Sequence, residues 1–196
     1  MLNKLIFTIS LLTFLLTTTQ VEAACVSGSC IEGTGVYQFE NGGSYEGDFE
    51  DGQISGLGTM TYSNGTIYKG TFLNGQPDGD GTIKYQGGAT YTGSFMAGAI
   101  YGEGTYSYAN GTKFTGHFVN NLPDGKGVMT YPDGARYEGN LKRGKFHGQG
   151  AFKYGDGSSY TGEFKKGKKN GKGVYIFANG IRQAGLFKND KYLAGS

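Results

Sequence analysis

The sequence predicts an all-β protein: an elongated, single-sheet solenoid of about seven β-hairpin repeats in an antiparallel meander. Two observations lead to this fold class. First, a pattern 23 residues long starts at Tyr45 and returns without insertion, with later starts at Tyr68, Tyr91, Phe114, Tyr137, Tyr160 and, in degraded form, Gln183. Second, glycine fills four columns of the full copies, which in the first copy are Gly47, Gly56, Gly58 and Gly65. A flexible linker has no reason to hold a period, whereas stacked repeats do.

The composition agrees with a β-rich fold. Among 196 residues there are 38 glycines, 15 tyrosines and 13 phenylalanines, but no tryptophan. Glycine is unfavourable inside helices, and aromatic residues are favoured in strands. Because stacked repeats form one elongated unit, we expect a single domain rather than two globular ones.

Residues 1–23 have the character of a secretory signal peptide. Lys4 precedes an apolar run from Leu5 to Leu16, and the segment VEA that ends at Ala23 suits signal peptidase. The apolar run of about twelve residues is shorter than the roughly 18–20 that a membrane-spanning helix needs. We therefore expect an exported protein (periplasmic, cell-surface or secreted), and the simple signal and short chain favour a bacterial source.

Cys25 and Cys30 follow directly, in the segment CVSGSC. In an oxidising compartment we expect them to form a disulfide that holds the N-terminal end of the first repeat. Two cysteines alone make a poor zinc site, because zinc takes four ligands. The alternative is that Cys25 is the lipid-modified first residue of a bacterial lipoprotein, although Glu22 stands where an aliphatic residue is expected.

One full repeat, residues 45–67, has the alternation of a β-hairpin. In YEGDF the aromatic side chains of Tyr45 and Phe49 point to the same face, because side chains in a strand alternate with period two. EDGQIS is the predicted turn, and GLGTMTY is the second strand. SNG is the turn to the next repeat, since an Asn-Gly pair is favoured in hairpin loops.

Within the hairpin, the predicted register places Gly47 opposite Gly58 and Phe49 opposite Gly56. A large ring then covers a bare glycine on the neighbouring strand. Interior glycine weakens a strand, and aromatic cover is a known remedy.

Between hairpins, the predicted register places Tyr62 opposite Tyr68. Nearly all large rings then share one face of the sheet. One column of that face is the candidate aromatic surface, made of Tyr62, Tyr85, Tyr108, Tyr131, Tyr154 and Phe177. The other column is made of Phe49, Phe72, Phe95, Phe118, Leu141, Phe164 and Phe187.

This pattern resembles the MORN repeat (membrane occupation and recognition nexus), whose signature is roughly Y-x-G-x-F-x-x-G-x-x-x-G-x-G. The segment YTGEFKKGKKNGKG, residues 160–173, matches every fixed position. The resemblance covers residues 30 to about 196, with local departures at Phe114, Leu141 and Asn121. It implies a twisted single-sheet solenoid and a docking or dimerising module.

The resulting organisation has four parts. We expect a signal peptide at 1–23, an N-terminal cap with the two cysteines and a partial repeat at 24–44, six full repeats at 45–182, and a C-terminal partial repeat or cap at 183–196. Atypical terminal copies are expected, because the ends of a solenoid must face water.

The sequence offers no catalytic or metal-binding constellation. Its two histidines, His117 and His147, occupy expected surface positions in a strand and a turn. There is no Cys/His cluster for zinc and no Gly-x-Ser-x-Gly for a nucleophile. Glycine-rich segments such as GDGTIKYQGG lack the Gly-Lys-Ser/Thr of a phosphate loop. We therefore predict that the protein is not an enzyme and takes no cofactor or metal.

Charge divides along the chain. Residues 25–96 hold two basic and eight acidic side chains, a net charge of −6, whereas residues 97–196 hold fifteen basic and seven acidic ones, a net charge of +8. The densest basic cluster, a candidate site for anionic surfaces, contains Lys165, Lys166, Lys168, Lys169 and Lys172. In a linear solenoid this division makes a dipolar rod.

We predict a non-catalytic, exported scaffold that acts by protein–protein association or by head-to-tail self-assembly, because open sheet edges invite pairing. The alternative is binding to an anionic membrane or cell-envelope polymer, lipid or glycan, through the basic repeats and the aromatic face. Nucleic acid is not an expected partner, since the export signal directs the chain away from it.

Overall fold

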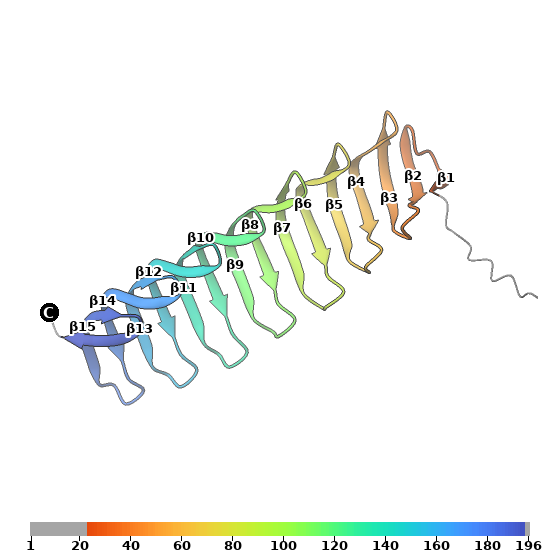
Figure 1. Ribbon diagram of the computed structural model, residues 1–196. Coiled ribbons are helices and arrows are strands. Elements are labelled where there is room, and N and C mark those ends of the chain that lie inside the picture. The colour runs from red at the N-terminus through yellow and green to blue at the C-terminus, as the bar shows by residue number, and fades with distance from the viewer. Residues whose placement is uncertain (1–22, 195–196) are drawn as a thin grey trace, which may run out of the picture.

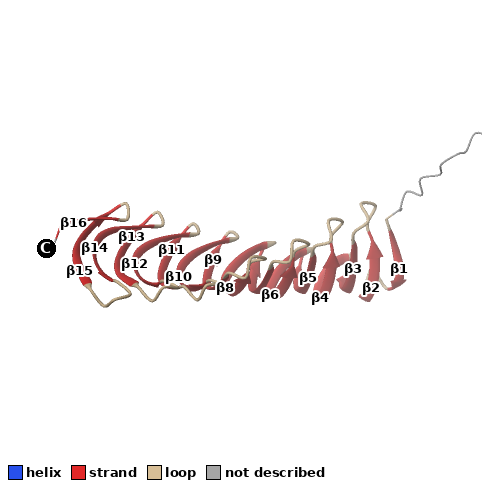
Figure 2. Ribbon diagram, turned by 90° about the horizontal axis from the view of Figure 1, so that it is seen from below, coloured by secondary structure: helices blue, strands red, loops and turns tan. Residues whose placement is uncertain are grey.

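The computed structural model describes residues 23–194, which form one open, 16-stranded antiparallel sheet (Figure 1). The strands lie side by side in chain order, so each pairs only with its neighbours in sequence. The result is a long ribbon, and in the C-terminal half its strands visibly curve (Figure 2). The predicted fold class is confirmed. No segment within residues 23–194 is helical, and none there forms a helix able to cross a membrane.

The strands are β1 (Ala24–Gly28), β2 (Gly33–Gln38), β3 (Ser44–Glu50), β4 (Gln53–Thr61), β5 (Ile67–Leu73), β6 (Gln76–Lys84), β7 (Thr90–Met96), β8 (Ala99–Ser107), β9 (Lys113–Val119), β10 (Leu122–Thr130), β11 (Arg136–Lys142), β12 (Lys145–Lys153), β13 (Ser159–Lys165), β14 (Lys168–Ile176), β15 (Arg182–Lys188) and β16 (Lys191–Ala194).

A two-residue turn, here called the hairpin tip, joins the two strands of each repeat. At the first tip both Asp51 and Gly52 have positive φ, 50° and 74°, which is the type I′ geometry that matches strand twist. Because this turn needs only two residues, β4 begins at Gln53, three residues earlier than predicted. The other tips are Asn74–Gly75, Ala97–Gly98, Asn120–Asn121, Arg143–Gly144, Lys166–Gly167 and Asn189–Asp190.

The turn between repeats works differently. The N–H of Tyr62 donates to the carbonyl of Thr66 (2.8 Å), and the N–H of Gly65 donates to the carbonyl of Tyr62 (2.9 Å). Asn64 Oδ1 accepts a bond from the N–H of Thr66 (2.9 Å). In this Asn-Gly pair only Gly65 has positive φ, at 79°. Asparagine therefore closes the loop with its side chain instead of adopting the left-handed conformation of a two-residue turn.

Within the hairpin, half of the predicted register is right. Gly47 lies opposite Gly58, as expected. Phe49 lies opposite Ile54 rather than Gly56, because the pairing shifts between Gly47 and Phe49. Gly56, with φ 61°, lies in this bulge, and a bulge adds residues to one strand and bends it.

Between hairpins, the predicted register is wrong by two residues. Met60, not Tyr62, lies opposite Tyr68. The reason is that the N–H of Tyr62 donates to Thr66 and closes the loop between the repeats. Tyr62 therefore does not take part in the strand pairing. The consequence is that Gly56 lies opposite Phe72, so an aromatic residue still faces a glycine across the strands.

The buried centre of each hairpin is an aromatic ring that lies over two facing glycines. In the third full repeat, Tyr91 is completely buried and Gly93 pairs with Gly104. A Cβ atom placed on Gly104 would lie 2.3 Å from the Tyr91 hydroxyl, and one placed on Gly93 would lie 2.5 Å from it. The Tyr91 hydroxyl donates to the carbonyl of Ser94 (3.1 Å). Two of the four glycine columns therefore exist because no side chain fits under the ring.

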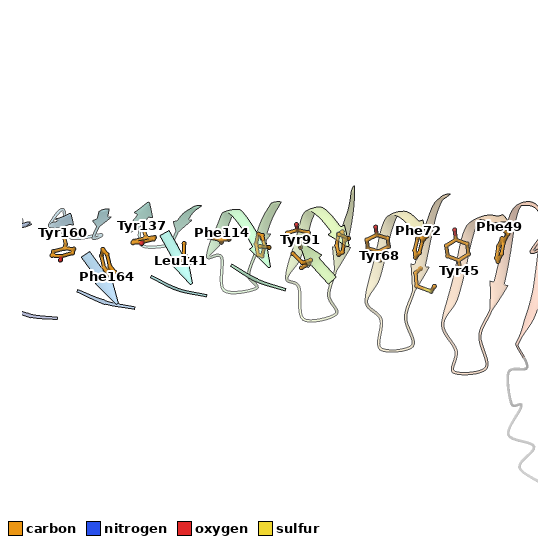
Figure 3. Packing of buried hydrophobic residues seen from close by; sticks show 14 of the residues in the cluster. Tyr45, Phe49, Tyr68, Phe72, Tyr91, Phe114, Tyr137, Leu141, Tyr160 and Phe164 are labelled. Atoms are coloured by element: carbon orange, nitrogen blue, oxygen red, sulfur yellow. The ribbon is translucent and has the colours of Figure 1, made fainter. Parts of the chain in front are cut away.

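These rings form a ladder along the ribbon (Figure 3). Tyr68 contacts Phe72 of its own repeat edge-to-face, with ring centroids 5.0 Å apart, and Phe95 of the next repeat at 4.9 Å. Such pairs each contribute about 0.5–1.5 kcal/mol beyond the area they bury. The same alternation repeats in the neighbouring hairpins, so the core is continuous although the sheet has a single layer.

The ladder changes where Leu141 replaces the phenylalanine. Its cross-strand partner is Phe146, at a position that holds isoleucine or proline in the four preceding repeats. The Phe146 ring stacks on Tyr137, with centroids 3.7 Å apart, and also contacts Phe164 at 5.8 Å. The missing ring is thus supplied by the opposite strand.

Backbone hydrogen bonds link each hairpin tip to the preceding repeat. The N–H of Gly75 donates to the carbonyl of Ile54 (2.9 Å), 21 residues earlier. The same bond recurs along the ribbon, ending with Asp190 donating to Lys169 (3.0 Å). Each repeat is therefore fastened directly to its neighbour.

At the N-terminal end, the predicted disulfide between Cys25 and Cys30 is present. It joins β1 to the segment before β2, and Cys30 packs against the aromatic core. The predicted signal peptide lies outside the described residues, apart from Ala23.

We expect Gly104→Ala to lower the free energy of unfolding by about 3 kcal/mol, because its Cβ would overlap a buried ring that cannot move aside. Chemical denaturation followed by circular dichroism measures this. Gly87→Ala is the matched control, since a Cβ there meets nothing within 4 Å. We expect it to change stability by less than about 0.5 kcal/mol. Equal losses in both variants would contradict the role of the ring.

Candidate functional site

The histidine and carboxylate side chains in the middle of the strands form hydrogen bonds with backbone groups. His117, expected at the surface, is half-buried, and its Nδ1 lies 2.9 Å from the carbonyl of Asp124. In the equivalent position of the first full repeat, Asp48 Oδ2 accepts a bond from the N–H of Leu57 (2.8 Å). This column is polar because its side chains pair with backbone groups freed by the bulge. Within residues 23–194, no three His, Cys, Asp or Glu side chains are grouped to hold a metal.

The first surface is a row of partly exposed aromatic rings that follows the loops between repeats. We call it the aromatic stripe, and it consists of Tyr37, Phe39, Tyr62, Tyr85, Tyr106, Tyr108, Tyr131, Phe152, Tyr154, Tyr175 and Phe177. The predicted column from Tyr62 to Phe177 forms its outer side. Residues next to the last position of the even-numbered strands, such as Tyr106 and Phe152, form its inner side.

Neighbouring rings of the stripe touch one another. Tyr106 lies 4.5 Å from Tyr108 and 6.0 Å from Tyr85, measured between ring centroids. Farther along, Tyr154 lies 4.5 Å from Phe152 and 5.9 Å from Tyr175. These contacts fix the rings against the ribbon while leaving one side of each exposed.

Apart from Tyr175, whose hydroxyl donates to Ser158 Oγ (2.9 Å), the stripe phenols differ from the buried ones in the hydrogen bonds of their hydroxyl groups. The buried Tyr137 donates to the carbonyl of Asn140 (2.7 Å), whereas the hydroxyl of Tyr131 reaches only the sulfur of Met129 (3.0 Å). Burial of the ring raises the pKa of Tyr62, Tyr85, Tyr108 and Tyr131, and raises that of Tyr154 to about 12. No buried side-chain polar atom of the described residues lacks a partner, so unpaired stripe hydroxyls reach solvent. They are available as hydrogen-bond donors at neutral pH.

A depression of about 340 Å³ lies beside the stripe at the N-terminal end. Tyr37 and Phe39 form one wall, Phe49 and Ile54 line it from the core, and the opposite wall comes from two hairpin tips, with Gly52, Gln53, Asn74 and Gly75. The curved ribbon thus has a hollow between the stripe and the tips in its first repeats.

Toward the C-terminus, side chains fill the equivalent position. Lys169 stands opposite Phe164, at a position that holds isoleucine or proline in the first four full repeats and Phe146 in the fifth. Its ammonium lies 4.7 Å from the centre of the Tyr175 ring and 5.8 Å from that of Tyr154. Burial lowers the pKa of Lys169. Lys169 is therefore held among rings, which was not foreseen, because the sequence groups it with its exposed neighbours.

The other four lysines of the predicted basic cluster are exposed, but they do not share one surface. Lys165 and Lys168 face each other across the strands beside a hairpin tip, and Lys166 lies in that tip. Lys172 lies at the bulge, where its N–H donates to Glu163 Oε1 (3.2 Å). The structure therefore brings three of the five together.

The opposite face of the sheet is polar. Over the first hairpins a trough of about 730 Å³ runs above the glycines, between Glu46, Asp48, Thr59 and Lys69. In the middle repeats Thr82 and Thr92 join their hydroxyl groups across the strands at 3.0 Å. This face has mixed charge and no row of rings.

The MORN repeat profile matches seven segments of the chain: residues 31–44, 45–67, 68–90, 91–113, 114–136, 137–159 and 160–182. The chain belongs to the MORN-repeat family. This MORN chain matches none of the curated proteins with which it was compared.

Among solved structures, the MORN ribbon is similar to the TCP domain of SAS-4 (dCPAP) of Drosophila melanogaster, determined in complex with a Proline Rich Motif of Ana2 (dSTIL). The TM-score is 0.50 at 16% identity, over 95% of this chain and 99% of that chain. The G-box domain of the microcephaly protein CPAP is less similar, with a TM-score of 0.44 at 14% identity, over 79% and 87% of the two chains. At these identities the likeness concerns the fold alone.

The buried phenols predict a loss of stability in alkali. Burial raises the pKa of Tyr45, Tyr68, Tyr91 and Tyr137 to about 12, against about 10 in an unfolded chain. A raised folded-state pKa favours the neutral phenol in the folded protein. We therefore expect this contribution to stability to be complete below pH about 10 and to fall as pH rises toward about 12.

Thermal unfolding at several pH values, together with phenolate absorbance, tests this. Tyr91→Phe is the control: it should cost about 1 kcal/mol at neutral pH through the lost hydrogen bond and reduce the alkaline slope. Phe114 already occupies the same column in the next repeat. Ionisation of all tyrosines near pH 10 with the fold intact would contradict the prediction.

Proposed function

We propose that this MORN ribbon is a non-catalytic binding scaffold that holds an extended, proline-rich peptide segment along its aromatic stripe. The observation that carries the proposal is the stripe itself: rings fixed by their neighbours yet open on one side, repeated from hairpin to hairpin. Aromatic surfaces of this kind suit proline-rich segments, which pack apolar ring against ring and lose little entropy on binding.

The spacing of the stripe supports an extended ligand that runs along the ribbon. Successive repeats are two strands apart, which corresponds to about 9.6 Å at the usual strand separation. A polyproline II helix makes one turn in three residues and about 9.3 Å. Every third residue of such a peptide therefore meets the next hairpin in nearly the same way. The hollow beside Tyr37 and Phe39 provides room for an apolar side chain at one end.

A solved structure of similar fold, bound to a proline-rich segment, supports this class of ligand. The TCP domain of SAS-4 was solved in complex with a Proline Rich Motif of Ana2. Because the two chains share only 16% identity, this suggests a class of partner and not a particular one.

A binding experiment tests the match of periods. A labelled peptide of four Pro-Pro-Leu triplets is titrated with the chain and followed by fluorescence anisotropy. The comparison peptide contains the same residues with a glycine after each triplet, which changes the repeat from three residues to four. We expect the triplet peptide to bind at least 10-fold more tightly. Equal affinities would contradict the register between peptide and hairpins.

Two sets of variants locate the site. Tyr85→Ser, Tyr108→Ser and Tyr131→Ser remove three stripe rings together, and we expect at least a 10-fold weaker Kd. The matched control removes three exposed apolar side chains outside the stripe, with Leu57→Ser, Leu73→Ser and Met96→Ser. It should stay within 2-fold of the parent. Circular dichroism confirms that each triple variant is folded, and equal weakening in both sets would refute the stripe as the site.

A second mode of association is self-assembly, favoured by the division of charge. The N-terminal part carries a net charge of −6 and the C-terminal part +8, and β1 and β16 each pair with only one neighbour within the described residues. End-to-end contact would bring opposite charges together and extend the sheet. The anionic-surface alternative rests on the same basic repeats.

Light scattering of residues 24–196 at about 50 mM and 500 mM salt tests self-assembly, because salt screens charge over a Debye length that shortens from about 14 Å to 4 Å. We expect mass to grow with concentration at low salt and to return to that of a monomer at high salt. A constant monomer mass in both conditions would eliminate head-to-tail assembly. It would leave peptide binding unaffected.

A further inference from the structure

We propose that the tips of the last three hairpins form a second binding site, which holds a linear acidic polysaccharide along the edge of the ribbon. The site is a line of exposed cations, here called the lysine ridge: Lys142, Arg143, Lys145, Lys165, Lys166, Lys168, Lys188 and Lys191. It lies at the opposite ends of the strands from the aromatic stripe and is independent of peptide binding there.

Six of the eight ridge cations form three like-charged pairs across the strands. Lys142 lies opposite Lys145, and Lys165 lies opposite Lys168. In the last hairpin, Lys188 lies opposite Lys191. Like charges directly opposite each other destabilise a pair of strands. Three successive hairpins thus carry an arrangement that is unfavourable until an anion neutralises it.

No carboxylate forms a salt bridge with a ridge cation within the described residues. The salt bridge found there joins Arg136 to Glu138, away from the ridge. Two nearby carboxylates pair with backbone N–H groups instead: Asp124 Oδ2 accepts from Arg143 (3.1 Å), and Asp190 Oδ1 accepts from Lys169 (2.9 Å). The ridge side chains remain exposed to solvent.

Two of the cations occupy strained positions. Arg143 and Lys166 are the first residues of their tips, with φ 49° and 53°. The left-handed conformation is unfavourable for an ordinary L-residue, and asparagine or aspartate, which stand at most other tips, tolerate it better. A long cation at this position places its charge at the outermost point of the hairpin.

The ridge begins abruptly. At the four earlier tips the equivalent positions contain no basic residue and read Glu50, Asp51, Gln53; Leu73, Asn74, Gln76; Met96, Ala97, Ala99; and Val119, Asn120, Leu122. The next three tips carry all eight cations. The cations are therefore concentrated on one edge of one part of the ribbon.

The geometry favours a stiff linear ligand with regularly spaced charges. Tips follow one another at about 9.6 Å, twice the strand separation, on a scaffold whose hydrogen bonds fix that interval. An acidic polysaccharide carries carboxylate or sulfate groups at fixed intervals, so several can meet lysine pairs at once. The ridge has no ring on which a nucleic-acid base could stack. A fluid membrane would not need a fixed interval, and is treated below as a competing outcome.

The test compares two variants with equal net charge. The ridge variant carries Lys142→Gln, Lys145→Gln, Lys165→Gln and Lys168→Gln. The matched control carries Lys113→Gln, Lys126→Gln, Lys153→Gln and Lys172→Gln, four exposed lysines elsewhere in the same half. Binding is measured by calorimetry to polygalacturonate, dextran sulfate and neutral dextran, and by sedimentation with vesicles of phosphatidylglycerol and phosphatidylcholine.

We expect the parent chain to bind one or both acidic polysaccharides at about 50 mM salt, and not neutral dextran. The ridge variant should bind at least 30-fold more weakly, and the control within 3-fold of the parent. Carboxylate and sulfate ligands are distinguished by which polymer binds. Equal losses in both variants would reduce the effect to net charge, and binding to vesicles without binding to either polymer would replace the proposal by a membrane site.

Stability without ligand gives an independent measurement. Removing like-charged pairs should raise the melting temperature of the ridge variant above that of the control. A ridge variant that binds less because it is misfolded would show the opposite shift. Peptide binding at the stripe should be unchanged in both variants, so failure of the ridge is separable from failure of the proposed function. A melting temperature lowered in the ridge variant alone would overturn the argument from charge repulsion.

Discussion

The contact between a buried ring and two facing glycines is the constraint on which the rest of the ribbon depends. In each full repeat the ring lies where the side chains of the glycine pair would otherwise be. In five of the six full repeats a phenol hydroxyl there also donates to a backbone carbonyl. The hydroxyl group is thus hydrogen-bonded within its own hairpin. The ring itself contacts aromatic rings on both sides. A single layer of sheet acquires in this way the buried core that usually requires a second layer.

That core determines which residues are left for binding. The aromatic ring at the start of each repeat is buried in the core, whereas the rings beside the loops between repeats remain half-exposed. Charged side chains divide in a similar way: polar side chains at the bulge pair with the backbone, whereas the exposed cations of the last three hairpin tips form no salt bridge within the described residues. The aromatic stripe and the lysine ridge therefore run along opposite edges of one curved ribbon. Neither is visible as a local motif, because each is made of one or two residues from every repeat.

Much of the fold follows from the sequence, since a strict 23-residue period with glycine and aromatic columns leaves few alternatives. The facing pair Gly47 and Gly58 was predicted correctly. The register between hairpins was not, because it depends on whether Tyr62 ends the strand or closes the loop, and alternation alone does not distinguish these. The site is less predictable. Lys169 is part of a run of lysines, yet it lies opposite Phe164 with its ammonium among rings, while Lys142 and Lys188, far apart in sequence, join Lys165 on one edge.

The hydrogen bond that spans 21 residues reaches the adjacent repeat and no farther. Every repeat consequently makes the same contacts with the next repeat. The number of repeats can therefore change without altering these contacts. Duplication of a 23-residue unit lengthens the ribbon by one equal step without rebuilding the core on either side. Loss of a unit shortens it in the same way. Length, and with it the span over which charges and rings are displayed, is then a property that such a chain can change by simple gain or loss of genetic modules.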